Sequence, residues 1–279
     1  MRKKSEHNEL IISTLEELSL HQEDIECIEH LHDWCRDLKI LLLQSNLISK
    51  IENLHKLKKL EYLNLALNNI ECVENLEALE SLNKLDLTLN FIGELTSIET
   101  LKDNYNLKIL ILTGNPCCDY PNYREYVIAT LPQLDNLDCQ DITLTDKIKA
   151  KPYLNSFRTD IVQKQVEYAM YRDKQKIRFQ QQKKELEAKM ATIENEEERI
   201  KTFWDSKSEN SPEIRHEIAK YHQLGRLKKS EHSEINSIKQ KQPQLFAPCG
   251  RPYNINKLQL PFSLNDEDYE YVLKLDIYK

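Results

Sequence analysis

The sequence predicts an α/β fold: a solenoid of short parallel strands, then a long helix and a short β-rich segment. Three observations predict it. A leucine pattern recurs at a nearly fixed period, a polar stretch lacks glycine and proline, and apolar residues alternate with other residues close to the last residue, 279. The repeats come first and are the most regular of the three.

The repeats are marked by asparagines that are 22, 22 and 25 residues apart, so three residues are inserted before the last repeat. Successive matches in one phase are hard to obtain by chance, and the motif is that of a leucine-rich repeat. Written out, the matches are Leu38-x-x-Leu41-x-Leu43-x-x-Asn46-x-Ile48, Leu60-x-x-Leu63-x-Leu65-x-x-Asn68-x-Ile70, Leu82-x-x-Leu85-x-Leu87-x-x-Asn90-x-Ile92 and Leu107-x-x-Leu110-x-Leu112-x-x-Asn115.

Each repeat supplies one strand and one turn, and only the neighbouring repeats can cover its leucines. The asparagine amides are expected to bond backbone groups of the turn after each strand, so they are interpreted as structural. A degenerate copy, Leu15-x-x-Leu18-x-Leu20, has Glu23 in place of the asparagine and is interpreted as an N-terminal capping repeat. Short helical turns on a convex side are predicted from Ile51, Leu54, Val73, Leu76, Leu95 and Ile98.

A C-terminal cap is predicted from Leu131-Pro132-Gln133-Leu134-x-x-Leu137-Asp138. Its apolar residues would cover the open edge of the last repeat. Asp138 is interpreted as a turn or cap residue rather than an acid catalyst. The repeat domain, with both caps, is expected to span 1–145.

The next region, 146–217, is expected to be helical. Residues from about 160 to 204 predict one long helix, because they are rich in Lys, Gln and Glu and contain no Gly or Pro. Apolar residues recur every seven positions at Phe179, Leu186, Ile193 and Ile200. The second apolar position that a coiled-coil heptad needs is mostly polar here. The pattern therefore allows either a weak coiled coil or a solvated helix that folds against a partner.

A basic linker is predicted over 218–257; its part 218–243 holds six basic and two acidic residues. It has only one aromatic residue there, Tyr221, so a solvated linker is favoured over nucleic-acid binding. Alternation then predicts two strands in 258–279. Two strands cannot bury a core, so either the chain is truncated relative to its relatives or the strands join another molecule. The alternating residues are Leu258, Leu260, Phe262, Leu264, Tyr271, Leu273, Leu275 and Ile277.

Composition describes a soluble protein, with 40% hydrophobic and 30% charged residues. No run of 18 apolar residues exists, and Met1–Glu9 lacks the apolar core of a secretion signal, which predicts a cytosolic or nuclear protein without a membrane partner. The seven cysteines form no C-x-x-C pair, which argues against a zinc site and a disulfide framework. Reduced thiols are expected.

Charge is divided unevenly along the chain. Residues 1–145 carry 13 Lys and Arg against 25 Asp and Glu, a net of −12, and residues 146–279 carry 26 against 21, a net of +5. Since an acidic solenoid repels phosphate backbones, nucleic acid is disfavoured as a partner and basic protein surfaces are favoured.

The sequence contains no motif for catalysis or cofactor binding. A Gly-rich phosphate loop, H-E-x-x-H, G-x-S-x-G and a Cys/His nucleophile pattern are all missing, and the histidines are interpreted as surface residues. We therefore predict no catalytic residue, no cofactor, no metal and no small-molecule substrate, and hence no enzyme.

The concave side of the solenoid is the predicted protein-binding site, because residues flanking the strand leucines point there into solvent. Apolar residues at both ends with polar residues between them suggest a protein interface. The alternative is that the N-terminal segment, the cap or the long helix folds over them. The predicted binding residues are Ile40, Leu42, Gln44, Tyr62, Asn64, Lys84, Asp86, Thr88, Ile109 and Ile111; Glu17, Ser19, His21, Ala66 and Thr113 share the repeat positions.

Longer stretches of the sequence carry a resemblance to a known family. In the repeats they are residues 15–22, 34–41, 60–70 and 90–95. Downstream they are Phe203-Trp204, Ser211-Pro212-Glu213-x-Arg215, Gly250-Arg251-Pro252-Tyr253-Asn254-Ile255-Asn256 and Phe262-Ser263-Leu264. Nearly from end to end, the sequence resembles the tilB family of dynein axonemal assembly factors.

The resemblance implies a non-enzymatic factor that preassembles dynein arms in the cytoplasm for ciliary or flagellar motility, with the cilium or flagellum as a second location. Implied partners are other assembly factors, chaperones and their AAA+ ATPases, and immature dynein chains. The family's C-terminal domain is similar to the p23-like (CS) co-chaperone fold, of which 258–279 would be the truncated start.

Two other classes of protein share some of these features. Regulatory subunits of protein phosphatases have similar repeats and caps, but they usually end soon after the cap. A ribonucleoprotein adaptor is disfavoured by the charge of −12 in the solenoid.

Overall fold

A computed structural model describes residues 14–207 and 209–223. They divide into two compact units, 14–175 and 176–223. Of the helices in these described ranges, none is both long and apolar enough to cross a bilayer. The predicted strands in 258–279 and most of the predicted linker lie outside the described residues.

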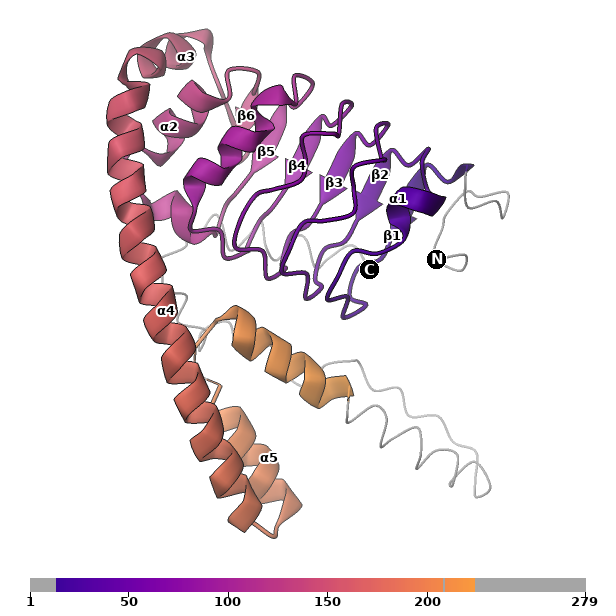
Figure 1. Ribbon diagram of the computed structural model, residues 1–279, viewed down its shortest axis with the longest axis vertical. Helices are drawn as coiled ribbons and strands as arrows, with labels where there is room; N and C mark the ends of the chain where they lie inside the picture. The colour runs from indigo at the N-terminus through magenta and orange to yellow at the C-terminus, as the bar shows by residue number, and fades with distance from the viewer. Residues whose placement is uncertain (1–13, 208, 224–279) are drawn as a thin grey trace. The chain divides into compact units, whose positions relative to one another are not determined.

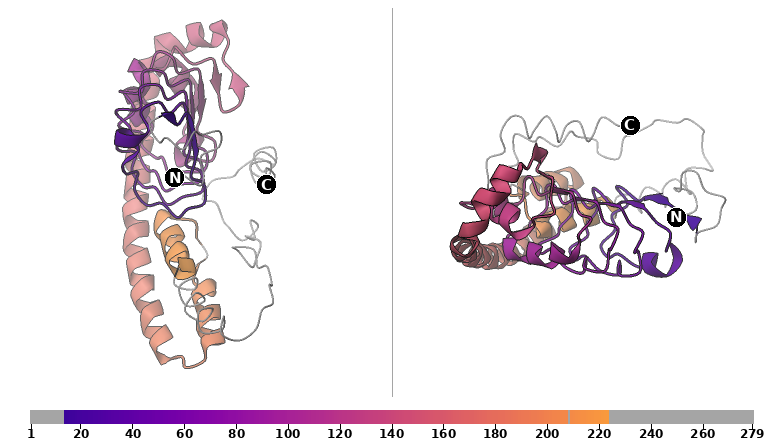
Figure 2. Two further views of the ribbon diagram at one scale, coloured as in Figure 1. Left: turned by 90° about the vertical axis from the view of Figure 1, so that its right-hand side faces the viewer. Right: turned by 90° about the horizontal axis from the view of Figure 1, so that it is seen from above.

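The first unit is a solenoid whose repeats each place one short strand in a common sheet (Figure 1). The sheet has seven strands in chain order; β1 to β6 are parallel and β7 runs antiparallel to β6. The coils follow one another side by side (Figure 2). The strands are β1 (Glu17–Ser19), β2 (Ile40–Leu42), β3 (Tyr62–Asn64), β4 (Lys84–Asp86), β5 (Ile109–Ile111), β6 (Asn136–Leu137) and β7 (Gln140–Asp141).

The predicted leucine core is confirmed. Leu41, Leu63, Leu85 and Leu110 form one in-register row inside the solenoid, and all are fully buried. The six residues predicted for the convex side are buried in the same core. Of the turns that carry these six residues, only one is a regular helix, the 3-10 helix η2 (Leu95–Asp103). Helix η2 lies in the segment between Asn90 and Asn115, which is three residues longer than the corresponding segments of the other repeats. The extra residues provide the length for its turns.

The repeat asparagines form a ladder through the stack. Asn90 accepts a hydrogen bond at Oδ1 from the amide of Ile70 (3.1 Å), and its Nδ2 donates to the carbonyls of Leu65 (2.9 Å) and Leu87 (3.0 Å). Each asparagine therefore satisfies backbone groups of its own repeat and of the preceding one, which would otherwise be buried without partners. Asn46, Asn68 and Asn115 bond in the same way.

Short helices cover the ends and the convex side of the solenoid. The cap at the last repeat packs α2 against α3 and ends the sheet with the β6–β7 hairpin. Helix α3 begins with a capping box between Thr143 and Asp146. These helices are α1 (Leu31–Trp34), η3 (Pro116–Asp119), α2 (Tyr123–Thr130), α3 (Leu144–Ala150) and η4 (Lys151–Tyr153).

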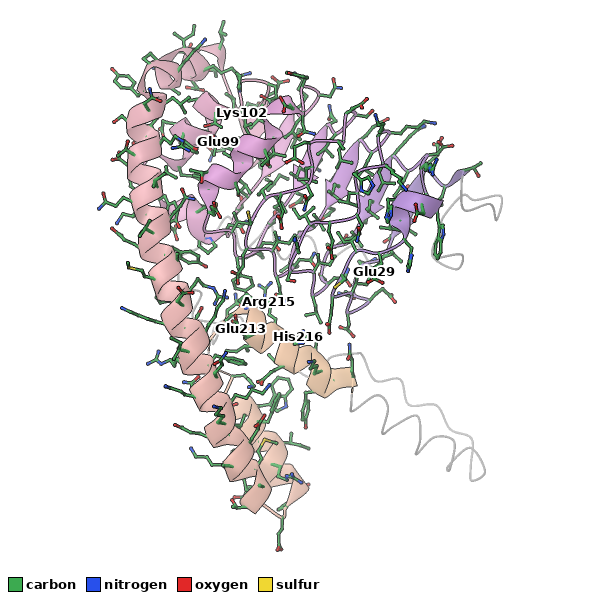
Figure 3. The ribbon with its side chains drawn as sticks, viewed as in Figure 1. Glu29, Glu99, Lys102, Glu213, Arg215 and His216 are labelled. Carbon is green, nitrogen blue, oxygen red and sulfur yellow. The ribbon has the colours of Figure 1, made fainter. Side chains whose placement is uncertain are left out.

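The first part of the long helix α4 (Leu154–Thr192) packs on the side of the repeats that carries η2. Glu99, which lies with Lys102 on η2 (Figure 3), accepts hydrogen bonds from Tyr126 (2.8 Å) and from Nε of Arg158 on α4 (3.0 Å). The Tyr168 ring lies against Gly93, where a Cβ atom would come within 2.0 Å of it. Glycine is therefore required there for the helix to dock.

The second unit corrects the expectation of one uninterrupted helix from about 160 to 204. Helix α4 ends at Thr192, and α5 (Glu196–Asp205) begins after Asn195, whose side chain accepts from the amide of Glu197 (3.0 Å). After this break the chain brings the Lys207 ammonium to 5.8 Å from the centroid of the Phe179 ring, and Leu186 is buried.

A further helix over 212–223 packs in the same unit. Tyr221 stacks on Phe203 of α5 at 4.3 Å between ring centroids, and Glu217 pairs with Lys207 and with Lys183 (3.1 Å). Residues 218–223, expected to start a linker, are thus helical, because their apolar side chains have a surface to cover. The domain boundaries themselves stay predictions.

Candidate protein-binding face

The concave face consists of the side chains that alternate with the core leucines on β2 to β5. Strand register arranges them in two rows. The first row is Ile40, Tyr62, Lys84 and Ile109, and the second is Leu42, Asn64, Asp86 and Ile111. The repeat spacing puts a third row, Gln44, Ala66, Thr88 and Thr113, just beyond the strands.

The two central strands use the same local hydrogen bond. Asn64 Oδ1 accepts from the amide of Ala66 at 3.0 Å, and Asp86 Oδ1 accepts from the amide of Thr88 at 3.0 Å. The Thr88 hydroxyl donates a second bond to the same Asp86 oxygen at 2.6 Å. Both side chains are held flat along the sheet, so the polar centre of the face is organised before any partner arrives.

Tyr62 and Lys84 lie together in the neighbouring row. The Lys84 ammonium is 4.6 Å from the centroid of the Tyr62 ring, and Asn64 Nδ2 donates to the Tyr62 hydroxyl at 3.1 Å. Burial raises the pKa of Tyr62 to about 12, helped by the negative charge of Asp86. The tyrosine therefore stays neutral at physiological pH and offers its ring face to a cation.

Burial also raises the pKa of Asp86 above its usual value, although the bonds from Thr88 and the charge of Lys84 act in the opposite direction. The residue as a whole is 1% exposed. Keeping a charge at such a position costs free energy unless a cation and hydrogen bonds compensate it.

The structure corrects the expectation that all predicted binding residues face solvent. Ile40, Leu42, Gln44, Tyr62, Lys84 and Ile109 are half-buried, whereas Asn64, Asp86, Thr88 and Ile111 are buried, as is Ala66. The polar members of the buried group bond one another or nearby amides instead of water, which folds them onto the sheet. The partly accessible surface is thus mainly the first row together with Leu42 and Gln44. Its role in binding stays a prediction.

The contacts that α4 makes with the repeats bear on the alternative that the long helix covers the concave face. Within residues 14–175, α4 bonds Thr96 through Gln165 (2.9 Å), Glu99 through Arg158 and Glu71 through Arg172 (2.6 Å). None of these repeat residues belongs to the concave rows. Residues 1–13 lie outside the described ranges.

Asp138 joins the cap to the last repeat. Its carboxylate accepts hydrogen bonds from the amide of Leu112 (2.7 Å), the hydroxyl of Thr113 (3.2 Å) and the hydroxyl of Tyr123 (2.7 Å). Burial raises its pKa, while these bonds act in the opposite sense. Asp138 thus links the residues that follow β5 to the first residue of α2.

Sequence reasoning missed a second set of structural asparagines on the convex side. Asn53 and Asn75 adopt left-handed backbone conformations (φ 58° and 60°) and donate to the carbonyls of Ile28 and Ile51, both at 2.7 Å. Their spacing of 22 residues equals the repeat period and was the available signal. Leu67, Leu89 and Gly114 occupy the same position in successive repeats, and all three have a left-handed backbone (φ 57°, 55° and 77°). The two leucines gave no sequence signal for this conformation, because leucine rarely adopts it.

The described residues give no sign of a metal centre: no group of three or more His, Cys, Asp or Glu side chains there is placed to hold an ion. The six cysteines in these ranges are free, and burial raises the pKa of Cys35 and, more strongly, of Cys117. Neither thiol is thereby activated as a nucleophile.

Two family models match the chain. A leucine-rich repeat model matches residues 4–167, and a model described as dynein axonemal assembly factor 11-like, CS domain, matches residues 215–279. The second match begins inside the described helix 212–223 and includes the predicted strands of 258–279.

Several curated proteins are similar over the whole chain. Protein tilB of Drosophila melanogaster is 62% identical over 279 residues, which cover 100% of this chain and 70% of that protein. Dynein axonemal assembly factor 11 is 47% identical in Danio rerio and 41% in Homo sapiens, with 100% of this chain covered and 67% and 68% of those proteins. Among solved structures, a chain of the Drosophila melanogaster SNF/U2A' complex is 32% identical with a TM-score of 0.45, covering 49% of this chain and 80% of that one.

Proposed function

Because the chain belongs to the leucine-rich-repeat family that includes protein tilB and dynein axonemal assembly factor 11, we propose that it serves the assembly of axonemal dynein arms. The observation that carries the proposal is the 62% identity to protein tilB over the full chain. The CS-domain match at 215–279 supports it from the other end of the chain.

We propose further that the protein acts as a non-enzymatic scaffold. The half-buried apolar and aromatic side chains on the concave face support a role in protein contact. The proposed site of action is the cytoplasm, before dynein arms enter the cilium or flagellum. Proposed partners are immature dynein chains, other assembly factors, and chaperones with their AAA+ ATPases.

The phosphatase-regulator alternative is less well supported. Such regulators usually end soon after the cap, whereas the likeness to the assembly factors extends over 100% of this chain. No observation on the concave face favours a phosphatase.

Deletion of the gene in a ciliated or flagellated cell of the source tests the proposal. Axonemal dynein heavy chains would be measured by mass spectrometry, with tubulin and radial-spoke proteins as internal controls. We expect selective loss of dynein from otherwise intact axonemes. Unchanged dynein with normal motility would overturn the proposal.

Rescue of the deletion strain then tests the concave face. Ile109→Glu places a charge on a half-buried position of the first row, so it should fail to restore dynein while the protein remains folded. Ile148→Glu, on α3 and 64% exposed, is the matched control and should rescue. Ile111 is unsuitable because its burial would confuse loss of binding with loss of folding.

A further inference from the structure

The concave face holds one negative charge that its own fold does not require. Asn64 and Asp86 are register partners on adjacent strands, and each accepts the same bond from the amide two residues later. Asn64 performs this role with a neutral amide. An asparagine at position 86 would do the same, so the carboxylate adds the cost of a buried charge without adding a necessary backbone contact.

The nearest cation does not neutralise Asp86 by direct contact. The Lys84 ammonium lies over the Tyr62 ring at 4.6 Å, and within the described residues no ion pair joins Asp86 to a basic side chain. Both hydrogen bonds from Thr88 go to Oδ1 of Asp86. The carboxylate thus keeps lone pairs on Oδ2 that Thr88 does not use.

An aromatic ring face beside a carboxylate is the chemistry that recognises a guanidinium or ammonium group. We propose that Tyr62 and Asp86 form a receptor for an arginine or lysine side chain of a protein partner. Asp86 is 1% exposed in the free chain, so the proposal includes that Lys84 occupies the receptor and covers Asp86 until the partner's cation displaces it. The inference depends on the proposed protein-binding role of the concave face, but not on its service to dynein.

The neighbours of Asp86 define what surrounds the cation. The half-buried apolar residues on either side of Asp86 are Ile109, which lies one strand away in the first row, and Leu42, which lies two strands away in the row of Asp86, at about 10 Å. The partner segment should therefore carry apolar side chains on both sides of its basic residue. The net charge of −12 over residues 1–145 would draw such a segment toward the face.

The test uses a phage-displayed library of random 16-residue peptides, panned against the intact chain, followed by calorimetric titration of the enriched peptides. We expect enriched sequences with Arg or Lys between two apolar residues. Asp86→Asn should weaken their binding by about tenfold or more, since a charge-assisted contact is lost. Lys84→Met should strengthen it by about threefold or more, because the self-occupied state no longer competes.

The opposite effects of Asp86→Asn and Lys84→Met on peptide affinity distinguish the proposal from a purely structural role of Lys84. If Lys84 only balances the charge of Asp86, then both substitutions weaken binding or leave it unchanged. Tyr62→Leu, which removes the ring face, supplies a second test and should also weaken binding. Lys50→Met and Asp103→Asn, at exposed positions outside the concave rows, are controls expected to leave affinity unchanged.

Thermal unfolding of each variant verifies that the solenoid remains intact. Peptides without a basic residue, weaker binding by Lys84→Met, or no enrichment at all would each overturn the inference. Those results would leave the dynein measurement untouched, so the failure of the receptor and the failure of the proposed function are distinguishable.

Discussion

The repeat unit, 14–175, and the helical unit, 176–223, bury their polar groups in different ways. In the repeats, ladder asparagines bond main-chain groups of two successive coils, so each contact is supported by its copies on either side. In the helical unit, Glu217 pairs with Lys207, which is only 5% exposed, beside the stack of Phe203 and Tyr221. The difference teaches that periodic sequence distributes stability over many sites, whereas the helical unit depends on a few.

The same contrast appears in the response of carboxyl groups to their surroundings. Burial would raise the pKa of Glu217, but bonds from Lys207 and Lys183 lower it below its usual value. The pKa of Asp86 is raised, with burial as the dominant cause. Ionisation therefore stabilises the helical unit and destabilises the concave face of the repeats.

The largest expected effect removes one rung of the ladder. Asn90→Ala leaves the amide of Ile70 and the carbonyls of Leu65 and Leu87 without their side-chain partner, which should cost roughly 4 kcal/mol of unfolding free energy. Urea unfolding followed by hydrogen exchange in residues 14–175 measures the loss. Asn83→Ala is the control because Asn83 is exposed. A loss below about 1 kcal/mol would show that the ladder is dispensable.

The next largest effect tests the helical unit. Lys207→Met leaves Glu217 with Lys183 alone, and breaking such a sheltered pair should cost about 3 kcal/mol. Hydrogen exchange should accelerate in 176–223 and remain unchanged in the repeats. Arg178→Met breaks the exposed pair with Glu209 (3.4 Å) and should cost about 1 kcal/mol or less. Equal losses in the two variants would contradict the dependence on a few contacts.

An intermediate effect is expected where α4 docks on the repeats. Gly93→Ala places a methyl group against the Tyr168 ring and should destabilise this docking by about 2 kcal/mol. Exchange in residues 154–175 would report the loss. Adding Tyr168→Ala removes the clash, so the double variant should lose less than the two single variants together. Strict additivity would refute the contact.

The smallest effect is a pair of opposite pH responses. The pKa of Asp86 is higher in the folded than in the unfolded protein, where it is near 3.8. Protonation of Asp86 therefore stabilises the fold at pH values below about 3.8, and this contribution is lost as the pH rises through the folded pKa. Asp86→Asn should therefore raise Tm at pH 7 by about 2–4 °C and lose this advantage in acid. A lowered folded pKa, as in Glu217, gives stability that is lost as pH falls below about 4.5. Glu217→Gln should lower Tm at pH 7 and match the parent in acid; shifts of the same sign would break the comparison.

The core of the repeats was predictable because its signals are local and repeated. Leu63 and Asn68 recur with their neighbours at one period, and that period fixes which side chains point inward. The break after Thr192 was not predictable in this way, since helix propensity is high on both sides of it. Lys207, whose ammonium lies 5.8 Å from the centroid of the Phe179 ring, is distant from Phe179 in the sequence and gives no local signal.

The binding face shows the same limit at the level of single residues. The sequence placed Tyr62, Lys84 and Asp86 on one face, because strand residues alternate and the repeats are in phase. It did not reveal that Asp86 is buried or that Lys84 lies over Tyr62. Those facts depend on rotamers and on hydrogen bonds to adjacent strands.

By itself, therefore, the sequence determined the repeat class, the inward leucines, the asparagine ladder and the family. Only the tertiary structure decided where the long helix breaks, how α4 rests on Gly93, and which polar groups of the concave face are buried. The physical reason is one of range. Periodicity along the chain encodes contacts between neighbouring repeats, whereas burial and charge pairing arise between residues brought together only after the chain has folded.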